Sequence, residues 1–277
     1  MTAATSTLTR AVPVRRGRHV PPAPGVCHLW PVRIGLTEQW LDLLEPDELR
    51  HAERLPVEQA RHTYVTSRAI QRLIGAHYLG VPPESVTVVR DCGYCGARHG
   101  RPRFAGATDR SVDYSVSHAG SWLIVAVVGT GRVGVDIEYA GRAAPGEDPT
   151  VATTHRDVDG LARHALTAAE HDRYTALPEP ARAGWFFRAW TRKEAAMKVT
   201  GLGLRAAPSR LDVTGPVLAV DAVPQWPAGT IHLYDLGAPE RYCCALAGTE
   251  PLRAVRVYDA GAVDGWPSDV RLRPSAE

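Results

Sequence analysis

Asp136 and Glu138 are two carboxylates set two residues apart inside the otherwise apolar segment 133–138. Side chains alternate between the two faces of a β-strand, so both carboxylates share one face and the valines and isoleucine share the other. Residues two apart in a strand have Cα atoms roughly 6.5–7 Å apart, which lets both side chains converge on one hard cation. The pair therefore predicts a Mg²⁺ site, with a merely solvated acidic strand face as the alternative.

A second group of chemical side chains lies in segment 185–198, where apolar residues recur at helical spacing without an interrupting proline. Trp190, Glu194 and Lys198 follow at i, i+4 and i+8, so they form one stripe along the predicted helix. Gly201 and Gly203 follow the segment and favour an end to the helix there. An ordinary exposed Glu–Lys pair would give the same spacing and remains the alternative.

Ser117 and His118 precede a strongly apolar strand predicted at 122–128. A short turn at 129–131 leads from this strand into the acidic segment, so an antiparallel hairpin is expected. The hairpin would bring Ser117 and His118 to the end of the sheet that carries the carboxylates. A hydroxyl and an imidazole beside a cation suit phosphate recognition or proton transfer, whereas a lone histidine is commonly structural.

Three motifs occur in order: Ser-x-Ser-His at 115–118, Gly-x-Asp-Ile-Glu at 134–138 and Trp-x-x-Lys-Glu-Ala-x-x-Lys at 190–198. Together they resemble the Sfp-type 4′-phosphopantetheinyl transferases, from about Asp47 to Asp212. The resemblance implies an α/β (α+β) fold made of two similar halves related by a pseudo-two-fold. Each half would hold an antiparallel-rich sheet packed by helices, with the cofactor in the cleft between the halves. We expect the halves at 26–130 and 131–262, after a disordered basic arm at 1–25 and before a loose tail at 263–277.

The activity implied by the resemblance is Mg²⁺-dependent transfer of 4′-phosphopantetheine from coenzyme A to a serine of an apo acyl or peptidyl carrier protein. Adenosine 3′,5′-bisphosphate would be released. The implied metal ligands are Asp136, Glu138 and Glu194. The implied catalytic residues are Glu194, Glu138, Lys198 and His118, and the base stays open between Glu138, Glu194 and a metal-held water. The implied contacts to coenzyme A are Arg54, Arg68, Arg101, Pro102, Ser117, His118, Lys193 and Lys198.

Three positions depart from the family pattern. Arg101 stands where members have lysine in a Gly-Lys-Pro element, which keeps the charge but changes its geometry. Ser115 stands where many members have asparagine, and Ala119 stands where many have serine. The changes at Ser115 and Ala119 weaken the match at the first motif, which keeps Ser117 and His118.

Two other classes of function remain open. A metal-dependent phosphohydrolase acting on coenzyme A or a related diphosphate would use the same carboxylates with water as the nucleophile. A non-catalytic coenzyme A binding module would not need Glu194, and the intact motif at 190–198 argues against it. Dependence on an acceptor protein distinguishes the transferase from the hydrolase.

Composition fits a cytoplasmic enzyme. The chain has 277 residues, of which 44% are hydrophobic, and its formal net charge of +2 is too small to indicate nucleic-acid binding. No run of 18 or more apolar residues is present, so we expect no membrane segment and a cytoplasmic location. By the resemblance we also expect a monomer.

Two further sequence patterns lie outside the three motifs, one of cysteines and a histidine and one of a helix start. Cys92, Cys95 and His99 have a spacing seen in zinc sites, but no partner pair of the right spacing follows, so a glycine-rich turn with reduced thiols is the favoured interpretation and zinc the alternative. Thr167 and Glu170 form a capping-box pattern that predicts a helix ending near Pro178. By the resemblance, the region from the loop at 141–149 through this helix is where a carrier protein docks, with Arg142, Arg163, Arg173 and Arg182 available to meet an acidic partner.

Overall fold

The structure is a computed structural model, and it describes residues 12–13, 20–35, 38–97, 100–105, 112–141, 157–259, 266 and 273–274. Most of the predicted basic arm, most of the predicted tail, residues 142–149 of the predicted loop, Arg142 and His99 lie outside the described residues.

Helices and strands occur in separate runs along the chain. The helices are α1 (Glu38–Leu41), α2 (Pro46–Glu53), α3 (Glu58–Leu79), α5 (Val158–Ala165), α6 (Ala168–Ala176) and α7 (Glu179–Thr200), with 3₁₀ helices η1 (Pro83–Ser85), η3 (Gly203–Ala206) and η4 (Pro208–Arg210). The strands are β1 (Val12–Pro13), β2 (Val26–Arg33), β3 (Val88–Val89), β4 (Arg103–Phe104), β5 (Asp113–Ala119), β6 (Trp122–Val128), β7 (Val133–Tyr139), β8 (Leu211–Asp212), β9 (Ala219–Val220), β10 (His232–Leu236), β11 (Tyr242–Gly248), β12 (Ala254–Asp259) and β13 (Arg273–Pro274).

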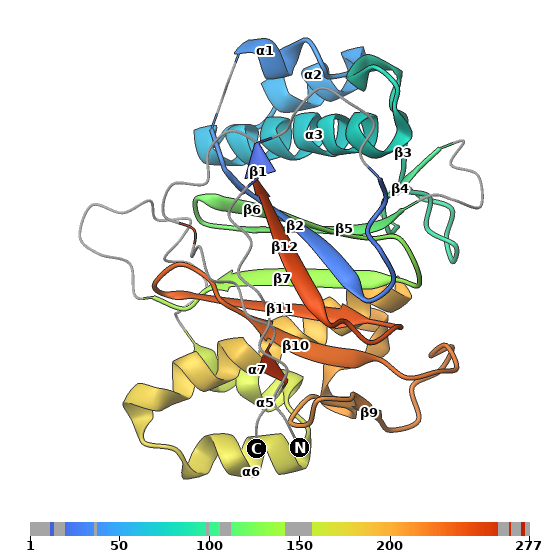
Figure 1. Cartoon of the computed structure of the whole chain (residues 1–277). Coiled ribbons are helices and arrows are strands. Elements are labelled where there is room, and N and C mark those ends of the chain that lie inside the picture. The colour runs from blue at the N-terminus through green and yellow to red at the C-terminus, as the bar shows by residue number, and fades with distance from the viewer. Residues whose placement is uncertain are drawn as a thin grey trace.

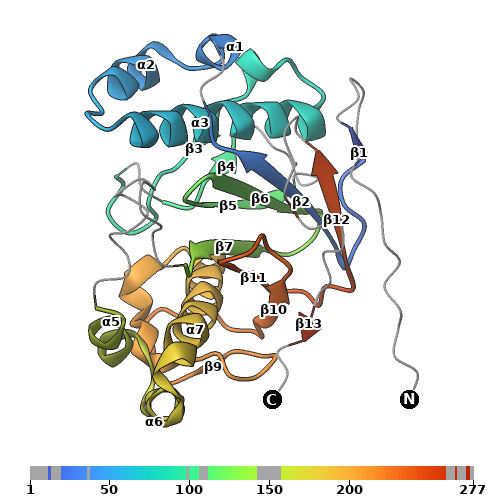
Figure 2. The same ribbon diagram turned by 90° about the vertical axis from the view of Figure 1, so that its left-hand side faces the viewer.

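Two sheets lie face to face between helices, in the order α3, first sheet, second sheet, α7 (Figure 1). The first sheet has the strand order β1-β12-β2-β6-β5, and the second has the order β13-β10-β11-β7. Helices α1 and α2 lie beyond α3, and α5 and α6 lie beside α7 at the opposite end of the molecule (Figure 2). The predicted mixed α/β fold with antiparallel-rich sheets is therefore confirmed, while the pseudo-two-fold stays a prediction.

The central strand β6 explains how the layers hold together. All of its residues are buried, as its continuous apolar run predicts. Leu123 and Val125 pack toward Ile70 of α3, whereas Ile124 packs between the sheets against Val135 of β7. The period-2 alternation of this one strand therefore supplies two separate cores.

The predicted hairpin between segments 122–128 and 133–138 is wrong. Both edges of β6 are already paired, with β2 on one side and β5 on the other. The turn at 129–131 instead passes the chain into the second sheet, where β7 pairs antiparallel with β11. Ser117 and Asp136 still meet, because β5 and β7 are the neighbouring edge strands of the two sheets.

Side chains of β5 join these two edges. Asp113 accepts a hydrogen bond from Val133 N at 2.8 Å, and Ser115 Oγ accepts one from Val135 N at 3.1 Å. Ser117 Oγ accepts a third from the backbone N of Ile137 at 3.4 Å. We call this set of three side-chain-to-backbone bonds the β5–β7 seam. It satisfies edge N–H groups that would otherwise be open and sets the register of β5 against the acidic strand.

Strand β12 crosses the predicted division of the chain. It belongs to the predicted C-terminal half at 131–262, yet it pairs parallel with β2 of the first sheet, for example Val255 with Cys27. The division at residues 130 and 131 stays a prediction.

Gly134 allows α7 to approach β7 closely. A Cβ atom added at Gly134 would lie 1.9 Å from the carbonyl oxygen of Ala195, which is backbone and cannot swing away. Gly134→Ala is therefore expected to lower the free energy of unfolding by about 3 kcal/mol or more, measured by urea denaturation.

The matched control is Gly184→Ala, on the exposed first half of α7, where an added Cβ meets no atom within 4 Å. That change should raise stability by roughly 0.5–1 kcal/mol because alanine favours the helix interior. A Gly134→Ala protein as stable as the unchanged protein would contradict the close approach.

Candidate active site

A pocket of about 930 Å³ opens between α3, β5, β7 and α7. It gathers most of the residues that the sequence assigned to chemistry. The predicted site residues that line it are Arg68, Pro102, Ser117, His118, Asp136, Glu138, Glu194 and Lys198. Residues more than 100 positions apart thus meet in one cavity because α7 packs against β7.

Lys198 lies at the centre of a compact polar cluster. Its Nζ donates to Asp136 Oδ1 at 2.6 Å, to Ser117 Oγ at 2.8 Å and to the carbonyl oxygen of Val135 at 3.1 Å. Ser117 Oγ in turn donates to Asp136 Oδ1 at 2.7 Å. The ammonium, the hydroxyl and one carboxylate oxygen are therefore held in a fixed relation by the last turn of α7.

The second oxygen of Asp136 has no such partner. Asp136 Oδ2 is buried and accepts no hydrogen bond from any described residue, and only 5% of the side chain is exposed. A buried carboxylate oxygen without a donor is costly unless a cation meets it. This orphaned oxygen fits a bound divalent metal.

Two further carboxylates line the same pocket near Asp136. The described residues contain no preassembled group of three or more His, Cys, Asp or Glu ligands. Mg²⁺ does not need one, because it usually takes one or two carboxylates together with waters and substrate phosphates. The donor set of Asp136 with Glu138 or Glu194 thus fits Mg²⁺ better than it fits a cation that requires a complete protein cage.

Burial and neighbouring negative charge raise the pKa of two of the carboxyl groups in the pocket. Burial, together with the negative charge of Asp136, raises the pKa of Glu138 to about 8. The same two causes raise the pKa of Glu194 above its ordinary value. Trp190 Nε1 donates to Glu138 Oε1 at 3.2 Å and fixes the side chain in the pocket. The site therefore carries a carboxyl group that protonates readily near neutral pH.

His118 also lines the pocket. Desolvation and the neighbouring Lys198 ammonium lower the pKa of its imidazole. A neutral imidazole at pH 7 can donate through one ring nitrogen and accept through the other.

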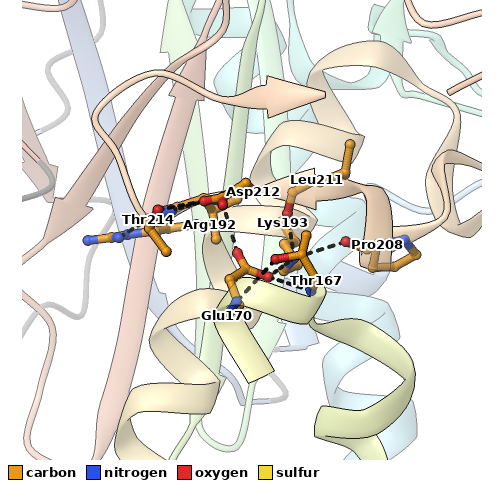
Figure 3. Close-up of polar contacts among 9 residues, drawn as sticks. Thr167, Glu170, Arg192, Lys193, Pro208, Leu211, Asp212 and Thr214 are labelled. Atoms are coloured by element: carbon orange, nitrogen blue, oxygen red, sulfur yellow. Dashed lines mark hydrogen bonds and ion pairs between the residues drawn. The ribbon is translucent and has the colours of Figure 1, made fainter. Parts of the chain in front are cut away.

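Lys193 lies away from the pocket, which corrects the expectation that it contacts coenzyme A. Its side chain is fully buried and its Nζ donates to Glu170 Oε2 at 2.5 Å, to Pro208 O at 2.9 Å and to Leu211 O at 2.5 Å. Figure 3 shows this network, which joins the start of α6 to α7 and to the segment after η4. Lys193 therefore has a structural role.

Glu170 has two functions in that network. Its Oε2 accepts a bond from Thr167 N at 2.8 Å and completes the predicted capping box of α6. Its Oε1 accepts from Val213 N at 2.9 Å. The predicted helix start is confirmed, and the capping residue is also the partner of the buried lysine.

Two other predicted contacts to coenzyme A do not line the pocket either. Arg54 is exposed at the end of α2. Arg101 lies behind the last turn of α7, where its guanidinium donates to Lys198 O at 2.6 Å, to Val133 O at 2.7 Å and to Asp113. Arg101 thus ties α7 to the β5–β7 seam, while its neighbour Pro102 reaches the pocket.

The sequence interpretation missed a polar wall formed by α3 and the segment after β3. Arg90 lines the pocket and donates to Gln71 Oε1 at 2.8 Å, and burial with the nearby charge of Arg68 lowers its pKa to about 10. The Arg68 guanidinium lies 4.8 Å above the Tyr64 ring. Gln71 could have been found because it follows Arg68 by three residues on one helix face, whereas nothing local marks Arg90.

Within the described residues, no helix is both long enough and apolar enough to cross a membrane.

The sequence of this chain is similar to those of known proteins. The model of the 4′-phosphopantetheinyl transferase superfamily matches residues 132–248, which include the acidic strand and α7. The 4′-phosphopantetheinyl transferase HetI of Nostoc sp. is 31% identical over 185 residues, covering 64% of this chain and 69% of HetI. The putative 4′-phosphopantetheinyl transferase slr0495 of Synechocystis sp. is 24% identical over 162 residues, covering 58% of each chain. The chain belongs to the 4′-phosphopantetheinyl transferase superfamily.

Proposed function

We propose that this protein transfers 4′-phosphopantetheine from coenzyme A to a serine hydroxyl of an apo acyl or peptidyl carrier protein, with Mg²⁺, and releases adenosine 3′,5′-bisphosphate. The observation that carries the proposal is the Asp136 cluster. One oxygen of this buried carboxylate is held by Lys198 and Ser117, and the other is left without a partner beside two more carboxylates.

Asp136, Glu138 and Glu194 are the residues that would hold the metal. When bound, a divalent cation there would neutralise charge on the pyrophosphate of coenzyme A and act as a Lewis acid toward its oxygens.

Lys198 and His118 provide the remaining charge stabilisation. The Lys198 ammonium is fixed by three hydrogen bonds and stays in place while charge develops on a phosphoryl oxygen. The His118 imidazole can donate a proton to the same group of oxygens or hold one there. Arg68 and Arg90 present two guanidinium groups to the phosphate of the nucleotide portion at the α3 side of the pocket.

A carboxylate of the pocket takes the proton from the attacking serine hydroxyl. The pKa of Glu138 is raised to about 8 when no cation is bound, and a cation at the site would lower it, so that Glu138 would be deprotonated and able to accept the proton; Trp190 holds its orientation. Glu194 has the same raised direction of pKa and is the alternative base.

The carrier protein is proposed to dock on the face made by α5 and α6. Arg163 and Arg173 are exposed on these helices, and so is Leu161, at 46%. The side chain of Arg182 instead bonds to the end of α6 and the turn that follows it, where it donates to Leu177 O at 3.1 Å and Thr175 O at 2.9 Å. Arg163 and Arg173 therefore suit an acidic helical partner better than Arg182 does. We further propose that the enzyme acts as a monomer in the cytoplasm.

The decisive experiment is intact-protein mass spectrometry of an apo carrier domain after incubation with this protein, coenzyme A and Mg²⁺. The expected result is a mass gain of one phosphopantetheine on the carrier, lost when a chelator is present or when the acceptor serine is changed to alanine. Consumption of coenzyme A at an unchanged rate without any carrier would contradict the proposal and favour a hydrolase.

Glu194→Gln is expected to lower the rate of carrier modification by about 100-fold, because the amide removes a negative ligand while keeping the side-chain shape. The rate should be measured over a series of Mg²⁺ concentrations, with circular dichroism as a check of the fold. The matched control is Glu179→Gln in the exposed first turn of the same helix, which should retain full activity. Undiminished, Mg²⁺-dependent activity of Glu194→Gln would remove Glu194 from the metal site.

A further inference from the structure

A second pocket, of about 600 Å³, lies on the other side of Arg101 from the active site. The turn that contains Cys92, Tyr94 and Cys95 forms one wall of it, and η3 with the end of α7 forms another. Nothing in the proposed transferase chemistry uses this turn.

The turn holds two sulfur atoms together. Cys92 N donates to Ala97 O at 2.8 Å and Gly96 N donates to Cys92 O at 2.9 Å, so the chain folds back on itself between the two cysteines. Gly96 has φ +70°, a left-handed conformation that favours glycine. The backbone N–H groups of Cys95 and Tyr94 and the Cys95 thiol lie close enough to the Cys92 sulfur to affect its pKa. These groups stabilise a thiolate and lower the pKa of Cys92, with the nearby charge of Arg205 as a smaller cause.

The surroundings of the thiol pair are basic. Arg101, Arg103, Arg132 and Arg205 line the pocket, together with Asp91 and Asp113. Both acids have arginine partners, since Asp113 pairs with Arg101 and Asp91 lies 3.9 Å from Arg103. Neither Arg132 nor Arg205 forms an ion pair with a carboxylate among the described residues.

Arg205 also helps to hold the turn in place. Its guanidinium lies 3.7 Å above the ring of Tyr94, which is 68% exposed, and it donates to Gln225 Oε1 at 2.9 Å. The cation is thereby held against the turn that carries Cys92.

The described residues bring two sulfur ligands to this turn, and no group of three His, Cys, Asp or Glu side chains among them could hold a metal. A dithiol needs only the pair. We propose that Cys92 and Cys95 form a redox-active dithiol that is oxidised to an intramolecular disulfide by small anionic disulfides entering the arginine-lined pocket.

The reaction balances with the small disulfide as the oxidant. The Cys92 thiolate attacks one sulfur of that disulfide and forms a mixed disulfide, and the other half leaves as a thiolate. The Cys95 thiol then loses its proton to solvent, attacks the Cys92 sulfur and expels the second half. Two electrons pass from the cysteine pair to the small disulfide, which is reduced to two thiols.

The chain provides an internal comparison in its other cysteines. Cys243 and Cys244 are adjacent in β11 and point to opposite faces of the strand. Burial raises the pKa of Cys243 to about 11 and raises the pKa of Cys244 as well. Burial also raises the pKa of Cys27 to about 12. These three thiols should stay reduced under conditions that oxidise the Cys92–Cys95 pair.

The test uses the full-length reduced protein and glutathione disulfide as the probe, with alkylation and intact-mass measurement. Oxidation should leave three of the five thiols available for alkylation, remove two hydrogens from the mass, and give a peptide map with Cys92 bonded to Cys95. The Cys95→Ser protein should stop at one glutathione adduct on Cys92, and Cys243→Ser should react like the unchanged protein.

The role of the arginine-lined pocket is tested by comparing an anionic oxidant with an uncharged one. Glutathione disulfide should react about tenfold faster than uncharged bis(2-hydroxyethyl) disulfide, after normalising both rates to those with free cysteine, and high salt or Arg132→Ala should remove this advantage. Five titratable thiols after saturating oxidant would overturn the proposal, as would a disulfide that maps elsewhere. Purified reduced protein that retains one equivalent of zinc, with both thiols shielded from glutathione disulfide until a chelator is added, would also overturn it in favour of a metal site.

Discussion

Asp136→Asn is expected to lower the rate of carrier modification by about 10²–10³-fold, the largest loss from any single isosteric change in the pocket. The unpartnered Oδ2 would become an amide or lose its negative charge, so the position facing the metal would no longer attract a cation. The remaining oxygen can still accept from Lys198 and Ser117, so the local structure should persist. The rate should be measured by mass spectrometry of the carrier under saturating coenzyme A.

The same substitution should leave stability unchanged or slightly raised. Asparagine removes part of the cost of burying the unpartnered carboxylate oxygen, and this offsets the loss of the ion pair with Lys198, whose side chain is 28% exposed. Asp221→Asn, an exposed change of equal charge, serves as the control and should keep full activity. If Asp136→Asn instead loses activity only because it unfolds, its thermal transition will show it and the assignment will fail.

Lys193→Met is expected to lower the free energy of unfolding by about 3–5 kcal/mol, because it leaves the Glu170 carboxylate buried without its cation. Both side chains of this pair are 0% exposed, so water cannot replace the lost partner. The carbonyl oxygens of Pro208 and Leu211 would lose a donor as well. Urea denaturation measures the effect.

A double change distinguishes loss of the charge pair from loss of packing. Glu170→Gln combined with Lys193→Met removes both charges and keeps one oxygen, which can accept from the N–H of either Thr167 or Val213, and should recover part of the lost stability. Arg188→Met on the exposed side of the same helix should change stability by less than about 0.5 kcal/mol. A Lys193→Met protein within 1 kcal/mol of the unchanged one would contradict a structural role for the pair.

Local signals in the sequence predicted local structure well. The capping box at Thr167, the apolar run of β6 and the opposite faces of β7 all depend on neighbouring residues, and each is found as expected. The pocket also brings the carboxylates, Lys198, Ser117 and His118 together. These positions follow from helix and strand periodicity once α7 lies on β7.

Strand pairing could not be predicted in the same way. A short turn after β6 favours a hairpin with β7, but β5, which precedes β6 by the turn at 120–121, takes one edge of β6, and β2, which is far away in the sequence, takes the other. Lys193 was misassigned for a simpler reason. It precedes Glu194 by one residue, which places it about 100° around a helix, so a motif that contains both cannot direct both into one pocket.

The parallel pairing of β12 with β2 has a consequence for synthesis of the chain. Residues 254–259 lie between β2 and β1 in the first sheet, so that sheet remains incomplete while most of the chain is already outside the ribosome. Contacts of such large sequence separation form late because loop closure must precede them. A nascent chain stalled before residue 254 should therefore expose the edge of β2 to chaperones and proteases, even though every residue of the proposed metal site has already been translated.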